Sequence, residues 1–314
     1  MTTGNKTVVN KLNFADFMKA FHAQYTYGMP DLKNFMISEQ VVHKNNRNLH
    51  GIIIRRPGTR IAPVFYYEDF YDAYKNGATI EECIMKMTSF VMDRDFTNEC
   101  LGEVFSSWEK VKDQLIVKLI NFNKNREQLM KVPYRVFGDM AVVVQIYLDD
   151  PSIGKGAVMV DRTLLDIWKK DTEELFDVAF ENMKKYRIKA INLLDFDIEE
   201  KINNQEAPDI YVVSYDAPFP GASALLQTQY FKTFATMKDA DFYVLPVSVH
   251  EVLLIQKNKE IVDDMLFGML HGINSDKNLS DNMLSDEVFY LDRKADNIEY
   301  LLGGKELLMM DPCA

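Results

Sequence analysis

Apolar and aromatic residues recur every three or four positions in several segments of the chain. The first such run follows Asn13, a residue typical of helix N-caps, and extends from Phe14 to Tyr25. Gly28 comes soon after the run and can end a helix. The pattern therefore predicts a helix over residues 14–28 that packs through an aromatic face.

Two more apolar runs begin with sequences that cap helix N-termini. Thr79 and Glu82 form a T-x-x-E capping box, and Asp171 and Glu174 repeat the arrangement with an aspartate. Both positions predict the start of a helix. The longest helix is predicted over residues 98–119, where large apolar side chains recur at helical spacing.

Short β-rich runs lie between the helical segments, and they tend to come in pairs. Two pairs are separated by turn sequences, at residues 149–155 and 216–221, which predicts hairpins. A helical segment follows each pair, so the chain has a recurrent β-β-α rhythm. The predicted strands are residues 40–43, 51–55, 140–148, 156–160, 210–214, 222–226, 242–245 and 252–255, and the helical segments lie near 69–74, 164–170, 227–237 and 259–271.

The strands of a hairpin run antiparallel, and this decides the predicted fold class. We expect an α+β fold with a largely antiparallel sheet built from β-hairpins and with helices packed on one face, in recurrent β-β-α units. The same pattern argues against a doubly wound fold of the Rossmann type, because such folds are built on parallel strands.

Charge is distributed unevenly along the 314 residues. The net charge is −11, yet residues 1–160 carry 20 Lys and Arg against 18 Asp and Glu, while residues 161–314 carry 16 against 29. The length suits two domains or one large unit. We predict a near-neutral N-terminal α+β region over residues 1–132 and a strongly acidic C-terminal α+β region over 133–314, and one continuous domain stays open as the alternative.

Composition argues against two classes of function, nucleic-acid binding and membrane association. The excess of acid repels phosphate backbones and anionic membrane surfaces, so we expect no direct nucleic-acid binding and no membrane association. The longest uncharged stretch, residues 217–231, contains prolines and is shorter than the ~20 apolar residues of a membrane span. The first 14 residues lack the apolar segment of a secretory signal. The expected compartment is the cytoplasm.

The sequence predicts neither a metal site nor a cofactor. Cys83, Cys100 and Cys313 show no C-x-x-C spacing, and the histidines lie on separate predicted elements without i, i+4 pairing. Cys83 falls on an apolar helical stripe and is expected in the core. The P-loop, nucleophile-elbow and zincin motifs do not occur in the sequence.

The best candidate for chemistry is the segment from Pro246 to Val252. On an extended chain Ser248 and His250 project to one face and Glu251 to the other, so a histidine base could act on a neighbouring hydroxyl. These three residues are the catalytic candidates. The structural alternative is that Pro246 breaks the strand, Ser248 turns the backbone and His250 is hydrogen-bonded in a packed interior.

A second polar cluster occupies residues 284–293. Its charged members Asp286, Asp292 and Arg293 are candidate binding residues. The structural alternative is a turn that leads into a strand over residues 288–290, with the aspartate and arginine at its end.

Five distinctive runs are spread over most of the chain. They are I-I-I-R-R-P-G at 52–58, Y-K-N-G-A-T-I-E-E at 74–82, K-L-I-N-F-N-K-N at 118–125, Y-V-L-P-V-S-V-H-E-V at 243–252 and L-S-D-E-V-F-Y-L-D-R at 284–293. Together they resemble an uncharacterised Firmicutes family, catalogued only as a domain of unknown function, that is common in gut anaerobes and often met on mobile elements.

The resemblance supplies context and no catalytic role, because the family has no established activity. All six candidate residues fall on its motifs, the first three on Y-[VI]-L-P-x-S-[IV]-H-E-V and the others on its closing motif. Val247 stands where the family usually has a second serine. This departure weakens a hydrolytic mechanism that needs a serine pair.

These observations favour a cytoplasmic bacterial protein that binds a macromolecular partner, itself expected to be a protein, in mobile-element or defence-related biology. Two alternatives stay open: a hydrolase-type enzyme centred on His250 and Ser248, and an acidic DNA mimic that inhibits a nucleic-acid enzyme. The sequence decides neither whether the chain is an enzyme nor its oligomeric state.

Overall fold

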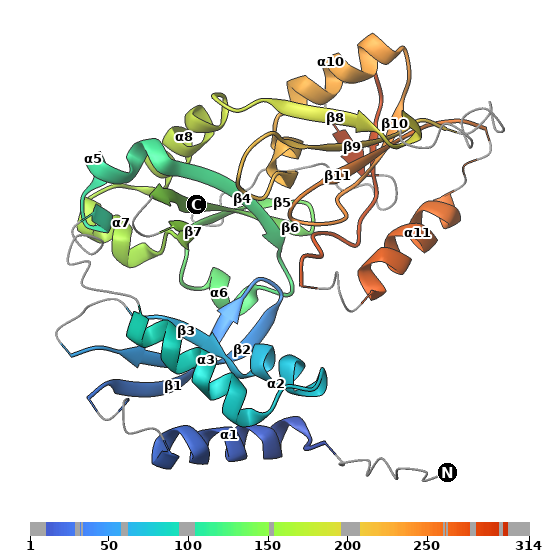
Figure 1. Cartoon of the computed structure of the whole chain (residues 1–314). Coiled ribbons are helices and arrows are strands. Elements are labelled where there is room, and N and C mark those ends of the chain that lie inside the picture. Colours follow the sequence, from blue (N-terminus) through green and yellow to red (C-terminus); the bar gives the residue numbers. More distant parts are fainter. Residues whose placement is uncertain are drawn as a thin grey trace, which may run out of the picture. The chain divides into compact units, whose positions relative to one another are not determined.

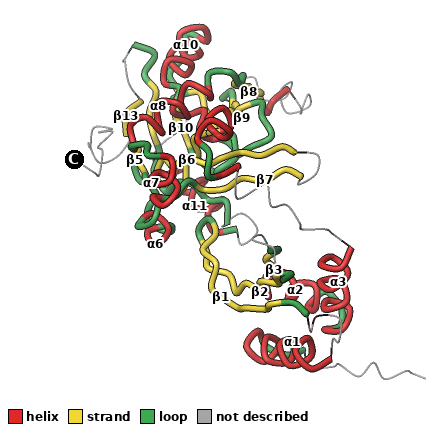
Figure 2. The backbone as a smooth tube through the Cα atoms, turned by 90° about the vertical axis from the view of Figure 1, so that its left-hand side faces the viewer, coloured by secondary structure: helices red, strands yellow, loops and turns green. Residues whose placement is uncertain are grey.

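The computed structural model is drawn in Figure 1 and, turned by 90°, in Figure 2. It describes residues 11–28, 32, 34–57, 62–93, 104–150, 154–195, 208–259, 261, 263–276, 281–294 and 298–300. Contacts divide the chain into two compact units. The N-terminal unit comprises residues 1–44 and 48–104, and the C-terminal unit comprises residues 45–47 and 105–314. This division by contacts falls upstream of the boundary predicted from the sequence near residue 132.

The N-terminal unit is a three-stranded sheet with helices on one face. The strand order is β1-β2-β3, and β2 and β3 are antiparallel. Side chains of all three helices form one core with Ile52 and Ile54 of β2, and Figure 2 shows the helices on the same side of the sheet. The elements are α1 (Phe14–Gly28), β1 (Met36–Lys44), β2 (Arg47–Arg55), β3 (Val64–Tyr66), α2 (Tyr67–Lys75) and α3 (Ile80–Asp93).

The predicted helix starts of this unit are confirmed. The side chain of Asn13 accepts a hydrogen bond from the backbone N–H of Asp16 at 2.9 Å. Thr79 and Glu82 form the reciprocal capping box, with distances of 2.8 and 3.1 Å. Cys83 is buried in the core as predicted, and burial raises the pKa of its thiol.

The C-terminal unit contains a four-stranded antiparallel sheet around its longest strand. β4 pairs with residues 140–146 of β6. β5 pairs with residues 140–143 of β6, and β7 pairs with residues 145–150. α8 packs against β4, and its N-terminus is capped by the predicted residue Asp171, which accepts from the N–H of Glu174 at 2.8 Å. The elements are α5 (Trp108–Val111), η2 (Lys112–Gln114), β4 (Leu115–Asn121), α6 (Arg126–Leu129), β5 (Tyr134–Phe137), β6 (Met140–Asp150), β7 (Gly154–Met159), α7 (Arg162–Trp168) and α8 (Thr172–Met183).

The long helix predicted over residues 98–119 is wrong. Residues 98–103 lie outside the described residues, α5 ends at Val111, and residues 115–121 form β4. Six of the seven β4 residues are buried, so both faces of the strand are covered. A strand of this kind reads as a continuous apolar run, which periodicity alone cannot distinguish from a buried helix.

A six-stranded sheet forms the rest of the C-terminal unit, with the order β13-β12-β10-β11-β9-β8. α11 packs on the face that carries Tyr243 and Leu253, whereas Phe234 of α10 contacts Phe242 on the opposite face. Helices therefore lie on both faces here, and the expected one-face arrangement is found in the N-terminal unit. The elements are β8 (Ile188–Asn192), η3 (Leu193–Asp195), β9 (Ile210–Tyr215), η4 (Ala222–Leu226), α10 (Thr228–Lys238), β10 (Phe242–Leu245), β11 (Val252–Gln256), α11 (Asp263–Ser275), β12 (Phe289–Leu291) and β13 (Ile298–Tyr300).

The strand predicted over residues 222–226 is also wrong, because this segment is the 3-10 helix η4. It follows Gly221, where an added Cβ would lie 2.7 Å from the backbone nitrogen of Tyr215 and 3.0 Å from the carbonyl oxygen of His250. The chain turns sharply at this close approach and does not return as a strand. Every strand pairing with a described register is antiparallel, and the predicted α+β class is confirmed.

Candidate functional site: a pocket beside β1

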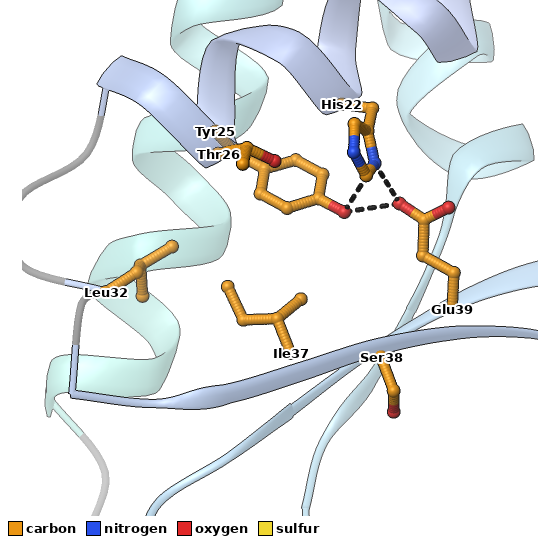
Figure 3. A pocket seen from close by; sticks show the side chains of 7 residues that line it. All are labelled: His22, Tyr25, Thr26, Leu32, Ile37, Ser38 and Glu39. Carbon is orange, nitrogen blue, oxygen red and sulfur yellow. Dashed lines mark hydrogen bonds and ion pairs between the residues drawn. The ribbon is translucent and has the colours of Figure 1, made fainter.

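The N-terminal unit contains a pocket of about 370 Å³ between α1 and β1. Figure 3 shows α1 above the pocket, β1 below it, and the side chains of His22, Tyr25 and Glu39 meeting at one end. Three consecutive residues of β1 contribute to the lining. The described residues that line the pocket are His22, Tyr25, Thr26, Leu32, Ile37, Ser38 and Glu39.

A hydrogen-bond network converges on one oxygen of the Glu39 carboxylate. Oε1 lies 2.6 Å from Nδ1 of His22 and accepts from the hydroxyl of Tyr67 at 2.5 Å. The hydroxyl of Tyr25 donates to the same oxygen and lies 3.0 Å from Nδ1 of His22. The network joins α1, β1 and the first residue of α2, so the fold itself fixes the position of the carboxylate.

The electrostatics of the network keep Glu39 ionised. Burial raises the pKa of Glu39, but the hydrogen bonds from Tyr25, Tyr67 and His22 outweigh burial, so the pKa lies below its ordinary value. Burial, followed by the hydrogen bond to Glu39, raises the pKa of both tyrosines. Near neutral pH the tyrosines are therefore donors, and the pocket holds a fixed negative charge.

The network leaves two polar atoms available to a ligand. An ionised carboxylate can only accept, so Nδ1 of His22 carries the proton that faces Glu39. Among the described residues, neither Nε2 of His22 nor Oε2 of Glu39 has a hydrogen-bond partner. Oε2 of Glu39 can therefore accept a hydrogen bond from a cationic or donor group that lies between the aromatic and the aliphatic wall of the pocket.

Residues 14–293 match the model of a family of unknown function, DUF5688. The chain belongs to this family. The match contains the pocket, Tyr67 and all six residues selected from the sequence. No curated protein and no solved structure shows significant similarity to the chain.

The DUF5688 chain carries Ser248, His250 and Glu251 in the loop between β10 and β11, not on an extended strand as expected. Ser248 Oγ accepts a hydrogen bond from the backbone N–H of His250 at 3.1 Å, and the N–H of Ser248 donates to the carbonyl of Glu251 at 3.3 Å. The serine hydroxyl thus turns the backbone after Pro246. His250 is exposed, and no described residue hydrogen-bonds to its ring.

Two of the second set of selected residues, Asp292 and Arg293, follow the C-terminal end of β12. Arg293 forms an ion pair with Asp239, and its N–H donates to Oδ1 of Asp241 at 3.1 Å. Asp292 accepts from the N–H of Lys294 at 2.7 Å. The predicted strand is confirmed as β12.

Asp286 lies in a separate cluster around a partly buried carboxylate. Its N–H donates to Oδ2 of Asp139 at 3.0 Å, and the fully buried Ser285 donates to Oδ1 at 2.6 Å. Burial raises the pKa of Asp139 despite these hydrogen bonds. Asp286 therefore anchors the segment before β12 through its backbone, and none of its contacts joins it to Asp292 or Arg293.

Two further findings concern the described residues of this chain only. None of their helices combines the length and apolar character that crossing a bilayer requires. Within the same ranges, no group of three or more His, Cys, Asp or Glu side chains is placed to hold a metal ion.

Proposed function

We propose that this chain is a binding protein, and that its N-terminal unit binds an extended segment of a partner protein along the open edge of β1. The observation that carries the proposal is that three consecutive residues of this edge strand, 37–39, line the pocket. A segment added beside β1 would gain backbone hydrogen bonds and reach the pocket with a side chain, as in β-strand addition.

The edge of β1 is long and exposed. β1 has nine residues and ends the sheet order β1-β2-β3 of its unit. Met36 is 62% exposed and Val41 is 51% exposed. Proteins normally protect such an edge with short strands, charges or prolines, because it offers unpaired N–H and C=O groups to other chains. A nine-residue edge strand with exposed apolar side chains beside a pocket therefore favours a binding role.

The direction of the backbone groups follows from the hairpin. β1 and β2 are joined by a two-residue turn at 45–46, so Lys44 belongs to the pair that closes the hairpin and bonds to β2. Backbone groups of successive strand residues point to opposite edges. Ile37, Glu39 and Val41 therefore direct their N–H and C=O groups at the open edge.

The proposal includes the cellular compartment and the biological context of the protein. A cytoplasmic bacterial protein of mobile-element or defence-related biology is supported by the composition and by the resemblance to a Firmicutes family. Catalysis at His250 is not part of it, since the hydroxyl of Ser248 is engaged by the backbone of the loop.

A display library of random 12-residue peptides, selected against the purified full chain, tests the proposal. Val41→Pro removes one outward-facing N–H and no bond to β2, and edge strands tolerate proline at such positions. Val41→Thr is the matched control because it keeps both the N–H and a β-branched side chain. Val41→Lys is a second edge-blocking variant, which retains the N–H and adds a charge.

We expect the wild type and Val41→Thr to enrich a common set of peptides, and both blocking variants to lose them while keeping the thermal midpoint within a few degrees. Absence of enrichment with the wild type, or equal enrichment with both blocking variants, would refute binding at this edge. Concentration-dependent dimerisation of the chain that Val41→Lys abolishes would also refute it, because the occupant would then be a second copy.

A further inference from the structure

We infer that the pocket takes the basic side chain of an arginine or lysine in the bound segment, and that this residue pairs with Glu39. Apolar residues two positions before and after it complete the recognised pattern, apolar-x-basic-x-apolar. The inference rests on the proposed function and adds the chemistry that selects the segment.

The alternation of β1 places the selecting side chains on one face. Ile37 and Glu39 line the pocket, and Ile37 packs on the core that the helices cover. Side chains of one strand alternate between faces, so Val41 lies on the same face as these two. In an added strand, the residue opposite Glu39 and those two positions away project to this face too.

The charge of the pocket favours a cation opposite Glu39. The carboxylate is ionised, and all three donors of the network engage Oε1. Oε2 of Glu39 stays available as an acceptor, and the described residues of the lining include no lysine or arginine. A guanidinium or ammonium group supplies a donor for this oxygen and neutralises the negative charge of the carboxylate.

The walls and size of the pocket fit the stem of such a side chain. Leu32 and Ile37 are aliphatic, and the ring of Tyr25 forms an aromatic wall (Figure 3). Long basic side chains lay their methylene groups along apolar surface and extend the charged head to polar atoms. A volume of about 370 Å³ is at the small end of ligand pockets, which suits one side chain rather than a large cofactor.

The flanking apolar residues follow from the neighbours of Glu39. A residue two positions from the basic one lies opposite Ile37 on one side and opposite Val41 on the other. Val41 is 51% exposed, so an apolar partner would bury it. Cross-strand pairs of this kind add to the affinity that the backbone hydrogen bonds provide.

The test compares Glu39→Gln with Glu68→Gln, using the peptides that the wild-type full chain enriches. Glu68 is a suitable control because it also pairs with a histidine of this unit, His50, at 2.8 Å, and lies outside the pocket lining. We expect wild type and Glu68→Gln to select the apolar-x-basic-x-apolar pattern, and Glu39→Gln to lose the preference for the basic residue. Replacing the arginine of an enriched peptide by neutral, isosteric citrulline should weaken binding to the wild type about tenfold and to Glu39→Gln much less.

The outcomes separate this inference from the proposed function. Enriched peptides that depend on the β1 edge but carry no basic residue would refute the inference and leave edge binding intact. The same holds if Glu39→Gln selects basic residues as strongly as the wild type does. Failure of both blocking variants at Val41 to change enrichment would refute the proposed function itself.

Discussion

At the scale of single residues, the candidate site depends on contacts that sequence spacing reveals only in part. His22 and Tyr25 stand three positions apart on a helix that the sequence predicts correctly. Their partner Glu39 is on β1 and the second tyrosine, Tyr67, begins α2. Single-sequence patterns report periodicity within one element and carry no signal for which elements meet. The sequence therefore predicts the helix that carries His22, but it does not predict that His22 meets Glu39.

Tyr67→Phe tests whether the network stabilises the N-terminal unit. Tyr67 is 1% exposed and donates to an ionised carboxylate, so its loss should cost about 1–2 kcal/mol in the free energy of unfolding at pH 7. A depressed carboxyl pKa contributes stability above its unfolded value, about 4.3, and that contribution is lost as the pH falls through the folded pKa. The difference from the wild type should therefore shrink below about pH 4.

Urea unfolding at pH 7 and pH 3.5 measures this effect. Tyr71→Phe is the control, because its hydroxyl donates to the backbone carbonyl of Leu12 at an exposed site and its loss should matter little. An unchanged stability of Tyr67→Phe at pH 7 would show that the network does not hold the unit together.

Lys118 of β4 is a partly buried basic residue that no sequence pattern singles out. Its side chain shares a face with Ile116 and Ile120 and lies opposite Val143, and burial lowers its pKa to about 8. Lys118→Met should therefore raise the free energy of unfolding at pH 7 by an amount on the order of 2–3 kcal/mol. The sign follows from the lowered pKa: wild-type stability rises with pH between about 8 and 10.4, so the advantage of the variant should decrease there.

Urea unfolding at pH 7 and pH 9.5 distinguishes this effect from better packing, which would not depend on pH. Lys112→Met is the control, since Lys112 is exposed and pairs with Glu109. A Lys118→Met variant less stable than the wild type at both pH values would mean that the amine is not destabilising where it lies.

At the scale of elements, the sequence predicts helix starts and hairpin strands better than buried strands. Caps at Asn13, Thr79 and Asp171 are local chemistry and were confirmed. The apolar pattern over β4 predicts a helix because burial of both faces removes the alternation that marks a strand. β8 was missed inside a polar stretch, because it is half-exposed and contains Lys189. In both strands the degree of burial is set by tertiary packing, which local patterns do not encode.

The turn at Gly221 illustrates such a tertiary constraint. An added Cβ would meet the backbone nitrogen of Tyr215 at 2.7 Å, which is closer than atoms can approach without a shift. Gly221→Ala should therefore lower the free energy of unfolding by about 1–3 kcal/mol. Gly268→Ala is the control: its site in α11 is open, and alanine should stabilise the helix by up to about 1 kcal/mol. Thermal unfolding of the pair measures both effects, and equal midpoints would contradict the close packing.

The loop between β10 and β11 gives the opposite expectation for its histidine. The ring of His250 is exposed, whereas Ser248 Oγ holds the loop backbone. His250→Ala should stay within about 0.5 kcal/mol of the wild type, and Ser248→Ala should lose about 1 kcal/mol. Thermal midpoints compare the two variants. A loss of stability confined to His250→Ala would mean that the ring, and not the serine hydroxyl, fixes this loop.

At the scale of the whole molecule, the α+β class followed from the sequence, whereas the arrangement of contacts did not. Strands paired in hairpins imply antiparallel sheets, however the sheets pack against helices. The predicted α+β class is therefore correct despite the errors at residues 98–119 and 222–226. Three separate sheets and a compact unit that ends at Val104 depend on long-range contacts. The predicted boundary near residue 132 was placed from local sequence, which carries no record of which distant segments pack together.

Amide exchange of the full chain, measured residue by residue by NMR with and without a saturating enriched peptide, tests edge binding most directly. We expect the outward amides of Ile37, Glu39 and Val41 to become protected on binding, while those of alternate residues of β1, already bonded to β2, change little. Protection that leaves β1 unchanged and appears only in the C-terminal unit would contradict it.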